Sequence, residues 1–182
     1  MRSCTAGSIV RSTFMLVLVT CVGACTSTKA SPVAPANGGA DADAKLAMVA
    51  FVHGGAGPWA VAGFRMGEFA LRELGLPRGS FDLEVIHHTP HQVQYSCMAD
   101  GEAAATGASV GKLNLILADA APAETHTVFR RRSTGQSLDL HFTAAFAARY
   151  LNVSPDRLAE AGREVLGLRD ADIFEVIPNA HP

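Results

Sequence analysis

The side chains best suited to chemistry in this chain fall in two short segments. His53 opens the segment His-Gly-Gly-Ala-Gly-Pro, and Cys97 and Asp100 follow much later in the chain, three residues apart. Imidazole and thiolate groups bind transition metals, and they also serve as base and nucleophile in acyl transfer. We expect the two segments to meet, so that His53 and Cys97 face a shared cleft.

A metal in that cleft needs more than two ligands. His87 and His91 are the nearest further histidines, and either one, turned toward Cys97, would give a mixed nitrogen and sulfur site with an open position. Such a site suits zinc or another divalent transition metal. The alternative is a packed cysteine and a hydrogen-bonded core histidine. Asp100 could accept a hydrogen bond from a metal-bound ligand or bond to the turn that follows, and we favour the turn.

A metal-free ligand site is the second hypothesis. The backbone amides of Gly54, Gly55 and Gly57 precede a predicted helix, whose N-terminus favours a small anionic or polar ligand. Ser109 or Lys112 could add a contact. The same glycines could equally serve only to make a tight turn.

A third hypothesis makes Cys97 a nucleophile with a histidine base. The helix that carries Cys97 is predicted to begin near Pro90, so the thiol lacks the helix N-terminus that commonly lowers a thiol pKa. We therefore expect binding, with no catalytic activity of the chain's own.

The elements that must position these residues follow from periodicity and caps. Helical spacing and capping residues predict helices, and alternation or buried-type apolar runs predict strands. The expected helices are 43–52, 58–74, 90–106, 144–151 and 155–166, and the expected strands are 81–88, 113–117, 125–131 and 136–142. The first of these helices has a strand through residues 46–49 as its alternative, and we favour the helix. The last two strands flank a hairpin turn at Ser133, Thr134 and Gly135, where His126 and His141 are expected at the surface and not as ligands. This order of helices and strands favours an α+β domain with a mixed sheet.

Gly63 and Gly67 weaken the helix 58–74, which indicates that the face of the helix that carries them packs very close to a neighbour.

The N-terminus has the pattern of an export signal. Arg2 and Arg11 precede a short apolar run, and Val-Gly-Ala leads to Cys25. We expect residues 1–24 to be a signal peptide of the lipoprotein type, with Cys25 the lipidated first residue of the mature chain. The alternative is plain signal cleavage, since leucine is commoner than Val22 at its position. Residues 25–44 are rich in Pro, Gly, Ser and Ala and predict a flexible tether, which leaves 45–182 as the folded domain.

These features define the expected location and partners. The chain is predicted to be exported, as a periplasmic or outer-membrane lipoprotein whose partner is the membrane through its lipid anchor. Removing two arginines with the signal leaves 13 basic and 17 acidic side chains, a net charge of −4, so no nucleic-acid partner is expected. The sequence leaves open whether the domain forms an oligomer.

The two chemical segments also resemble a known family, the FmdE-like domains, which are named after a component of formylmethanofuran dehydrogenase. Members carry His-Gly-His-x-Cys-Pro-Gly at the head of a helix, and later Cys-x-x-Asp and Thr-Gly-Cys-Thr-x-Gly-Lys-x-Asn-Leu. The residues that carry the resemblance here are His53, Gly54, Pro58, Gly63, Arg65, Met66, Gly67, Cys97, Asp100, Thr106, Gly107, Ser109, Gly111, Lys112, Asn114 and Leu115. The resemblance implies the helix-strand-helix and three-strand fold of that family, followed here by C-terminal helices.

The departures from the family pattern bear on metal binding. Gly55, Gly57 and Ala108 stand where the family has a histidine and two cysteines, and no cysteine follows Cys97 to build a zinc ribbon. Of the family's zinc-binding residues only His53 and Cys97 remain, and a structural zinc site needs four ligands. The resemblance therefore implies metal or small-ligand binding and not the methanofuran chemistry for which the family is named.

Overall fold

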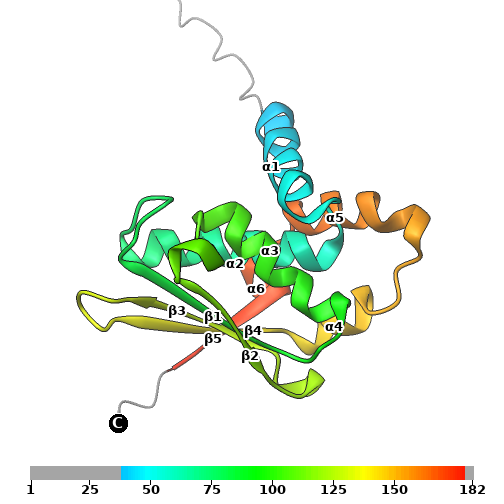
Figure 1. Cartoon of the computed structure of the whole chain (residues 1–182). Coiled ribbons are helices and arrows are strands. Elements are labelled where there is room, and N and C mark those ends of the chain that lie inside the picture. Colours follow the sequence, from blue (N-terminus) through cyan, green and yellow to red (C-terminus); the bar gives the residue numbers. More distant parts are fainter. Residues whose placement is uncertain (1–37, 179–182) are drawn as a thin grey trace, which may run out of the picture. The chain divides into compact units, whose positions relative to one another are not determined.

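The structure is a computed structural model that describes residues 38–178 (Figure 1). The predicted signal peptide and Cys25 lie outside the described residues. The helices are α1 (Gly38–His53), α2 (Pro58–Leu74), α3 (Val93–Thr106), α4 (Ala144–Tyr150), α5 (Leu158–Gly167) and α6 (Asp170–Ile173). The strands are β1 (Leu83–Thr89), β2 (Leu115–Asp119), β3 (His126–Arg131), β4 (Ser137–Phe142) and β5 (Phe174–Ile177).

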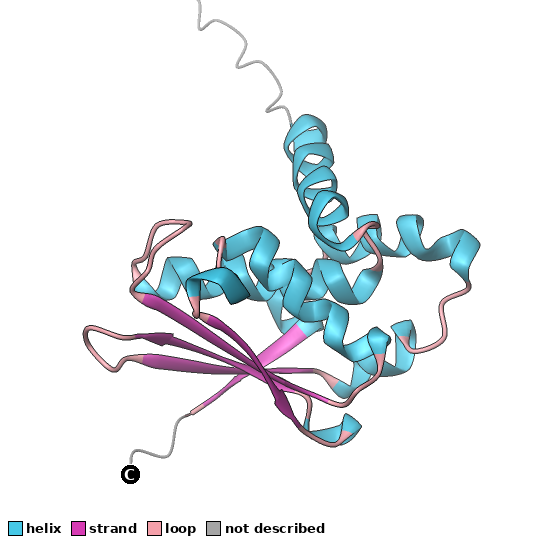
Figure 2. Ribbon diagram, in the orientation of Figure 1, coloured by secondary structure: helices cyan, strands magenta, loops and turns pink. Residues whose placement is uncertain are grey.

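The five strands form one mixed sheet in the order β2-β1-β3-β4-β5. β1 and β2 are parallel and are joined by a crossover that contains α3, whereas the other neighbours are antiparallel. Figure 2 shows the helices of residues 38–178 gathered over one face of this sheet and leaving its other face open. The predicted α+β class and mixed sheet are confirmed.

Glycine allows the two central helices to meet closely. α2 begins with Pro58 and is capped after Leu74 by Gly75, whose φ of 63° is left-handed, as the predicted caps require. A Cβ on Gly63 would collide with the carbonyl oxygen of Met98, and one on Gly101 would collide with that of Ala60. The close approach predicted for the Gly63 face is therefore confirmed, and its neighbour is α3.

An aromatic cluster joins this helix pair to the sheet and to α4. Trp59, in the first turn of α2, is buried and donates a hydrogen bond from Nε1 to the carbonyl of Tyr150 at 2.9 Å. Its ring packs edge-on against Tyr95, Phe142 and Phe146, with centroids 5.0 to 5.1 Å apart. Edge-to-face packing of this kind adds to the gain from burial alone.

Several predicted boundaries differ from the structure. α1 begins at Gly38, so residues 38–44, assigned to the tether, are helical, and α3 begins at Val93 and not near Pro90. The predicted helix 155–166 is a 3-10 turn, Pro155–Arg157, followed by α5. β5 was not predicted, and it adds a fifth strand at the edge of the sheet.

The strand predicted as buried at 113–117 is instead an exposed edge. Leu113 takes a left-handed φ of 54° after a short 3-10 turn, so the strand begins at Leu115. β2 pairs only with β1, and Ile116 and Leu117 are 42% and 59% exposed. An apolar run indicates a strand but does not show whether the strand lies at the centre or the edge of its sheet.

Among residues 38–178, no single helix is both long and apolar enough to cross a membrane. Of these helices, only α1 and α2 taken together have the length and composition that a membrane span requires. The two helices are bent by 111° at the break between them.

Candidate functional site

A cleft of about 520 Å³ lies where α1 turns into α2, beside the first turns of α3. Its wall includes His53, the glycine turn that follows, and Cys97, together with apolar side chains from the connection between α4 and α5. A smaller hollow of about 240 Å³ adjoins it, since His53, Val93 and Cys97 line both. The structure thus brings the two predicted segments together.

α5 holds the glycine turn in place. Gly162 of α5 packs directly on the turn, because a Cβ at that position would collide with the carbonyl oxygen of Ala56. Gly54 has a φ of 89°, a conformation that glycine adopts without strain. The C-terminal part of the chain therefore fixes one wall of the cleft.

Asp100 orients His53. Nδ1 of His53 lies 2.8 Å from Oδ2 of Asp100, and since a carboxylate only accepts, Nδ1 carries the donated hydrogen. This bond sets the tautomer and leaves Nε2 available. The preference for a bond from Asp100 to the turn after its helix is wrong, because His53 is its partner.

Cys97 is a buried, protonated thiol. Its Sγ donates to the carbonyl of Gln94 at 3.1 Å. Burial, and after it the charge of Asp100, raise the pKa of Cys97 to about 12. Because the thiolate is the reactive and metal-binding form, the nucleophile hypothesis for Cys97 loses its support.

The histidines offered as a third ligand lie elsewhere. His87 is fully buried on the helix-covered face of the sheet, where Nδ1 contacts Thr127 Oγ1 at 2.8 Å and Nε2 contacts the carbonyl of Tyr95 at 3.2 Å. The side chain of His91 is 90% exposed and pairs with Asp119 at 2.9 Å. Neither residue lines the cleft that His53 and Cys97 share.

Ser109 and Lys112 stabilise the turn after α3. Oγ of Ser109 accepts a hydrogen bond from the Lys112 backbone amide, and Nζ of Lys112 donates to the carbonyl of Gly107 at 2.8 Å. Both residues are absent from the lining of the cleft and of the smaller hollow. The structure therefore places these two side chains at the turn after α3 and outside the cleft.

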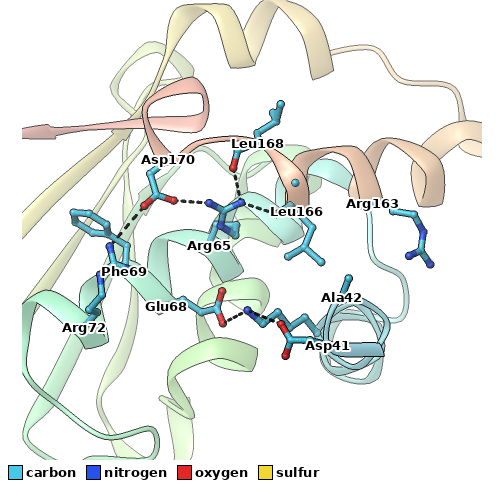
Figure 3. A pocket seen from close by; sticks show the side chains of 12 residues that line it. Asp41, Ala42, Arg65, Glu68, Phe69, Arg72, Arg163, Leu166, Leu168 and Asp170 are labelled. Carbon is cyan, nitrogen blue, oxygen red and sulfur yellow. Dashed lines mark hydrogen bonds and ion pairs between the residues drawn. The ribbon is translucent and has the colours of Figure 1, made fainter. Parts of the chain in front are cut away.

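A second hollow, of about 510 Å³, lies between α1, α2 and α5 (Figure 3). Its charged groups are paired with one another: Lys45 with Glu68 at 2.9 Å, and Arg65 with Asp170 at 2.6 Å. Arg65 also donates to the carbonyls of Leu166 and Leu168 at the end of α5. This hollow joins elements of the fold and offers a ligand few unpaired groups.

A cluster of side chains that was not predicted lies on the face of the sheet opposite the helices. Among the described residues, His126, Asp139 and His141 form the one group whose three ligand atoms all lie within 4.8 Å of one another, so this group could hold a metal ion. His126 and His141 were expected to be surface residues, and both are half-buried. The hairpin register could have revealed the pair, because a turn at 133–135 sets His126 opposite His141.

The fold is that of an α+β domain with a five-stranded mixed sheet, and the comparison with known families identifies it further. The model of the family "FmdE, Molybdenum formylmethanofuran dehydrogenase operon" matches residues 52–175, and the chain belongs to this family. A search of the curated proteins finds no match to the chain.

The cleft does not fit the zinc that the family resemblance implies. Only His53 and Cys97 stand at ligand positions, Cys97 holds its proton, and no group of three ligands forms around the pair within residues 38–178. The metal-binding group that the described residues do offer is of histidine and aspartate and lies on the sheet.

Proposed function

We propose that this FmdE-family domain binds a small organic molecule with an acidic or other hydrogen-bond-accepting group in the cleft between α2 and α3. The observation that carries this proposal is the side chain of Gln94, which lines the cleft. Its Nε2 atom is buried and has no hydrogen-bond partner among residues 38–178. A buried donor without a partner costs about 1 to 3 kcal/mol, so a ligand acceptor that reached it would recover that cost.

The other cleft groups suit the same ligand. His53, oriented by Asp100, can donate or accept at Nε2, and the amides before α2 lie at a helix N-terminus, where negative charge is favoured. The apolar part of the lining, including Trp59, Leu151 and Leu158, suits a hydrocarbon or aromatic body. The role proposed is binding, because burial raises the pKa of the Cys97 thiol and leaves it poorly suited to act as a nucleophile.

The test is a thermal-shift screen of monocarboxylic acids, from acetate to medium-chain and aromatic acids, with and without EDTA. We expect at least one acid to raise Tm equally in both conditions. Titration calorimetry of that acid should then show Gln94→Leu weakening binding about tenfold, the effect of one lost hydrogen bond of about 1.4 kcal/mol. The matched control is Gln92→Leu, because Gln92 is exposed and lies outside the cleft.

Two results would contradict the proposal. Binding that disappears with EDTA would place a metal in the cleft. Equal affinity of the wild type and Gln94→Leu would show that the unpartnered amide does not contact the ligand.

We also propose that the chain is exported and anchored to a membrane through a lipid on Cys25. The basic start, short apolar run and Val-Gly-Ala-Cys order support this proposal. A mature chain whose first residue is Cys25 bearing a lipid mass is the expected result of mass spectrometry, and an intact Met1 would contradict it.

A further inference from the structure

Three histidines form a ladder across the open face of the sheet. His88 on β1 pairs in register with His126 on β3, and His126 pairs with His141 on β4. The rings stack nearly parallel, His88 on His126 with centroids 4.2 Å apart and His126 on His141 at 4.6 Å. Side chains alternate along a strand, so this face is the opposite one from His87 and the helices.

Asp139 adds a carboxylate to this ladder. It lies two residues before His141 and therefore on the same face. Its Oδ1 lies 3.1 Å from Nε2 of His141 and 3.9 Å from Nε2 of His126. The same oxygen is buried and, despite its short ion-pair distance to His141, accepts no well-aligned hydrogen bond from the described residues, so a desolvated carboxylate faces two ring nitrogens.

The backbone fixes which nitrogen of His126 is free. Nδ1 of His126 lies 2.7 Å from the carbonyl oxygen of Glu124, and because a carbonyl only accepts, Nδ1 carries the hydrogen. The neutral ring then presents the lone pair of Nε2 toward Asp139. Histidines that bind metals commonly donate their other ring nitrogen to a backbone carbonyl or carboxylate in this way.

From this convergence we propose that His126, Asp139 and His141 bind one divalent transition-metal ion of the zinc class. Two imidazole nitrogens and one carboxylate oxygen suit Zn²⁺, Co²⁺ or Ni²⁺, whereas Ca²⁺ and Mg²⁺ prefer oxygen ligands alone. Three protein ligands leave a position open for water or another molecule. His88 positions the site by packing its ring against His126.

This site is independent of the cleft. It uses none of the residues that line the cleft, and its ligands lie on the face of the sheet that the helices leave open. It also uses neither of the residues, His53 and Cys97, that match the zinc-binding positions of the family. Failure of ligand binding in the cleft would therefore leave this proposal standing, and the reverse also holds.

The test uses the full chain, purified without a histidine tag and stripped with EDTA. Titration with ZnCl₂ should give one ion per chain at the site, and Co²⁺ should give visible d–d absorption. His141→Asn and the near-isosteric Asp139→Asn should each weaken binding at least about tenfold, the scale seen when a metal site loses a supporting contact. His91→Asn, an exposed histidine outside the group, and Cys97→Ser should bind as the wild type does.

Circular dichroism of each variant distinguishes lost binding from lost folding. If His141→Asn fails to fold, Asp139→Asn provides the same comparison. A wild type that binds no Zn²⁺ at micromolar concentration overturns the proposal. It is equally overturned if Cys97→Ser abolishes binding while Asp139→Asn leaves it unchanged.

Discussion

A buried chain of polar side chains connects α3 to the sheet. Oγ1 of Thr127 donates to Oε1 of Glu102 at 2.6 Å, and Nδ1 of His87 lies 2.8 Å from the same hydroxyl. The hydroxyl hydrogen is given to Glu102, so Nδ1 must donate, and Nε2 must donate to the Tyr95 carbonyl. With Glu102 ionised, both ring nitrogens carry hydrogen and His87 is an imidazolium.

The pKa of His87 is consistent with that assignment. Burial alone would lower the pKa, but the charge and hydrogen bonding of Glu102, 3.4 Å away, outweigh it and raise the pKa above 6.5. A raised pKa in the folded state contributes stability below the unfolded pKa, and this contribution is lost as pH rises through the folded pKa.

Glu102→Gln should therefore destabilise the domain most at acidic to neutral pH. We expect the free energy of unfolding to fall by about 1 to 3 kcal/mol at pH 6, the cost of leaving a buried group without its partner. The deficit should shrink as pH rises through the wild-type pKa of His87. Urea unfolding between pH 6 and 9 measures it, with Glu73→Gln, a half-exposed glutamate, as the control. Parallel curves of stability against pH for wild type and variant would contradict the imidazolium assignment.

At the residue scale, the sequence predicted where the chemically reactive side chains lie better than it predicted what those side chains do. It placed His53 and Cys97 at one cleft and His87 on the apolar side of its strand, because helix caps and strand alternation set those directions. It could not show that burial keeps the Cys97 thiol protonated or that Asp139 lies between two histidines. Those properties depend on what covers each face, which is decided by segments far away in the chain.

At the scale of elements, the α2 and α3 pair depends on glycines. Gly63→Ala would gain up to about 1 kcal/mol of helix propensity but would force a methyl group against the carbonyl of Met98. Overpacking of this kind costs about 1 to 3 kcal/mol or more, and the backbone of α3 cannot move without opening the core. We expect a net loss of stability in urea unfolding.

The control for this prediction is Gly167→Ala in α5. A Cβ at Gly167 meets nothing within 4 Å, so the propensity gain should appear with no clash. If Gly63→Ala proved as stable as Gly167→Ala, the close contact between the two helices would not exist in solution.

The strands show the limit of periodicity. The hairpin of β3 and β4 was predicted, because alternation and a turn at Gly135 define both strands and their register. The exposure of β2 and the existence of β5 were not predicted. β2 lies at one edge of the sheet, and β5, only 4 residues long, lies at the other edge. Few contacts constrain an edge strand, so its local sequence carries a weak signal.

At the scale of the whole domain, one side chain joins the helical core to the C-terminal elements. The side chain of Arg65, on α2, is 16% exposed, and its Nη1 donates to the carbonyls of Leu166 and Leu168 at 2.6 and 2.8 Å. Its Nη2 bonds to Asp170 at 2.6 Å (Figure 3). A cation at the end of α5 satisfies carbonyls that have no partner within the helix.

Arg65→Lys should loosen the C-terminal elements more than the rest of the domain. An ammonium on a flexible stem cannot reproduce the planar fork of a guanidinium, so we expect a loss of about 1.5 to 3 kcal/mol, the value of hydrogen bonds to a charged group. Hydrogen exchange should speed up first at amides of α5, α6 and β5. Arg72→Lys, whose side chain is 59% exposed, should change stability by less than about 0.5 kcal/mol. Uniform acceleration of exchange across β1 and β3 would instead show that Arg65 stabilises the whole domain.

Because α5 packs on the glycine turn through Gly162, a variant that frees α5 should also weaken ligand binding in the cleft.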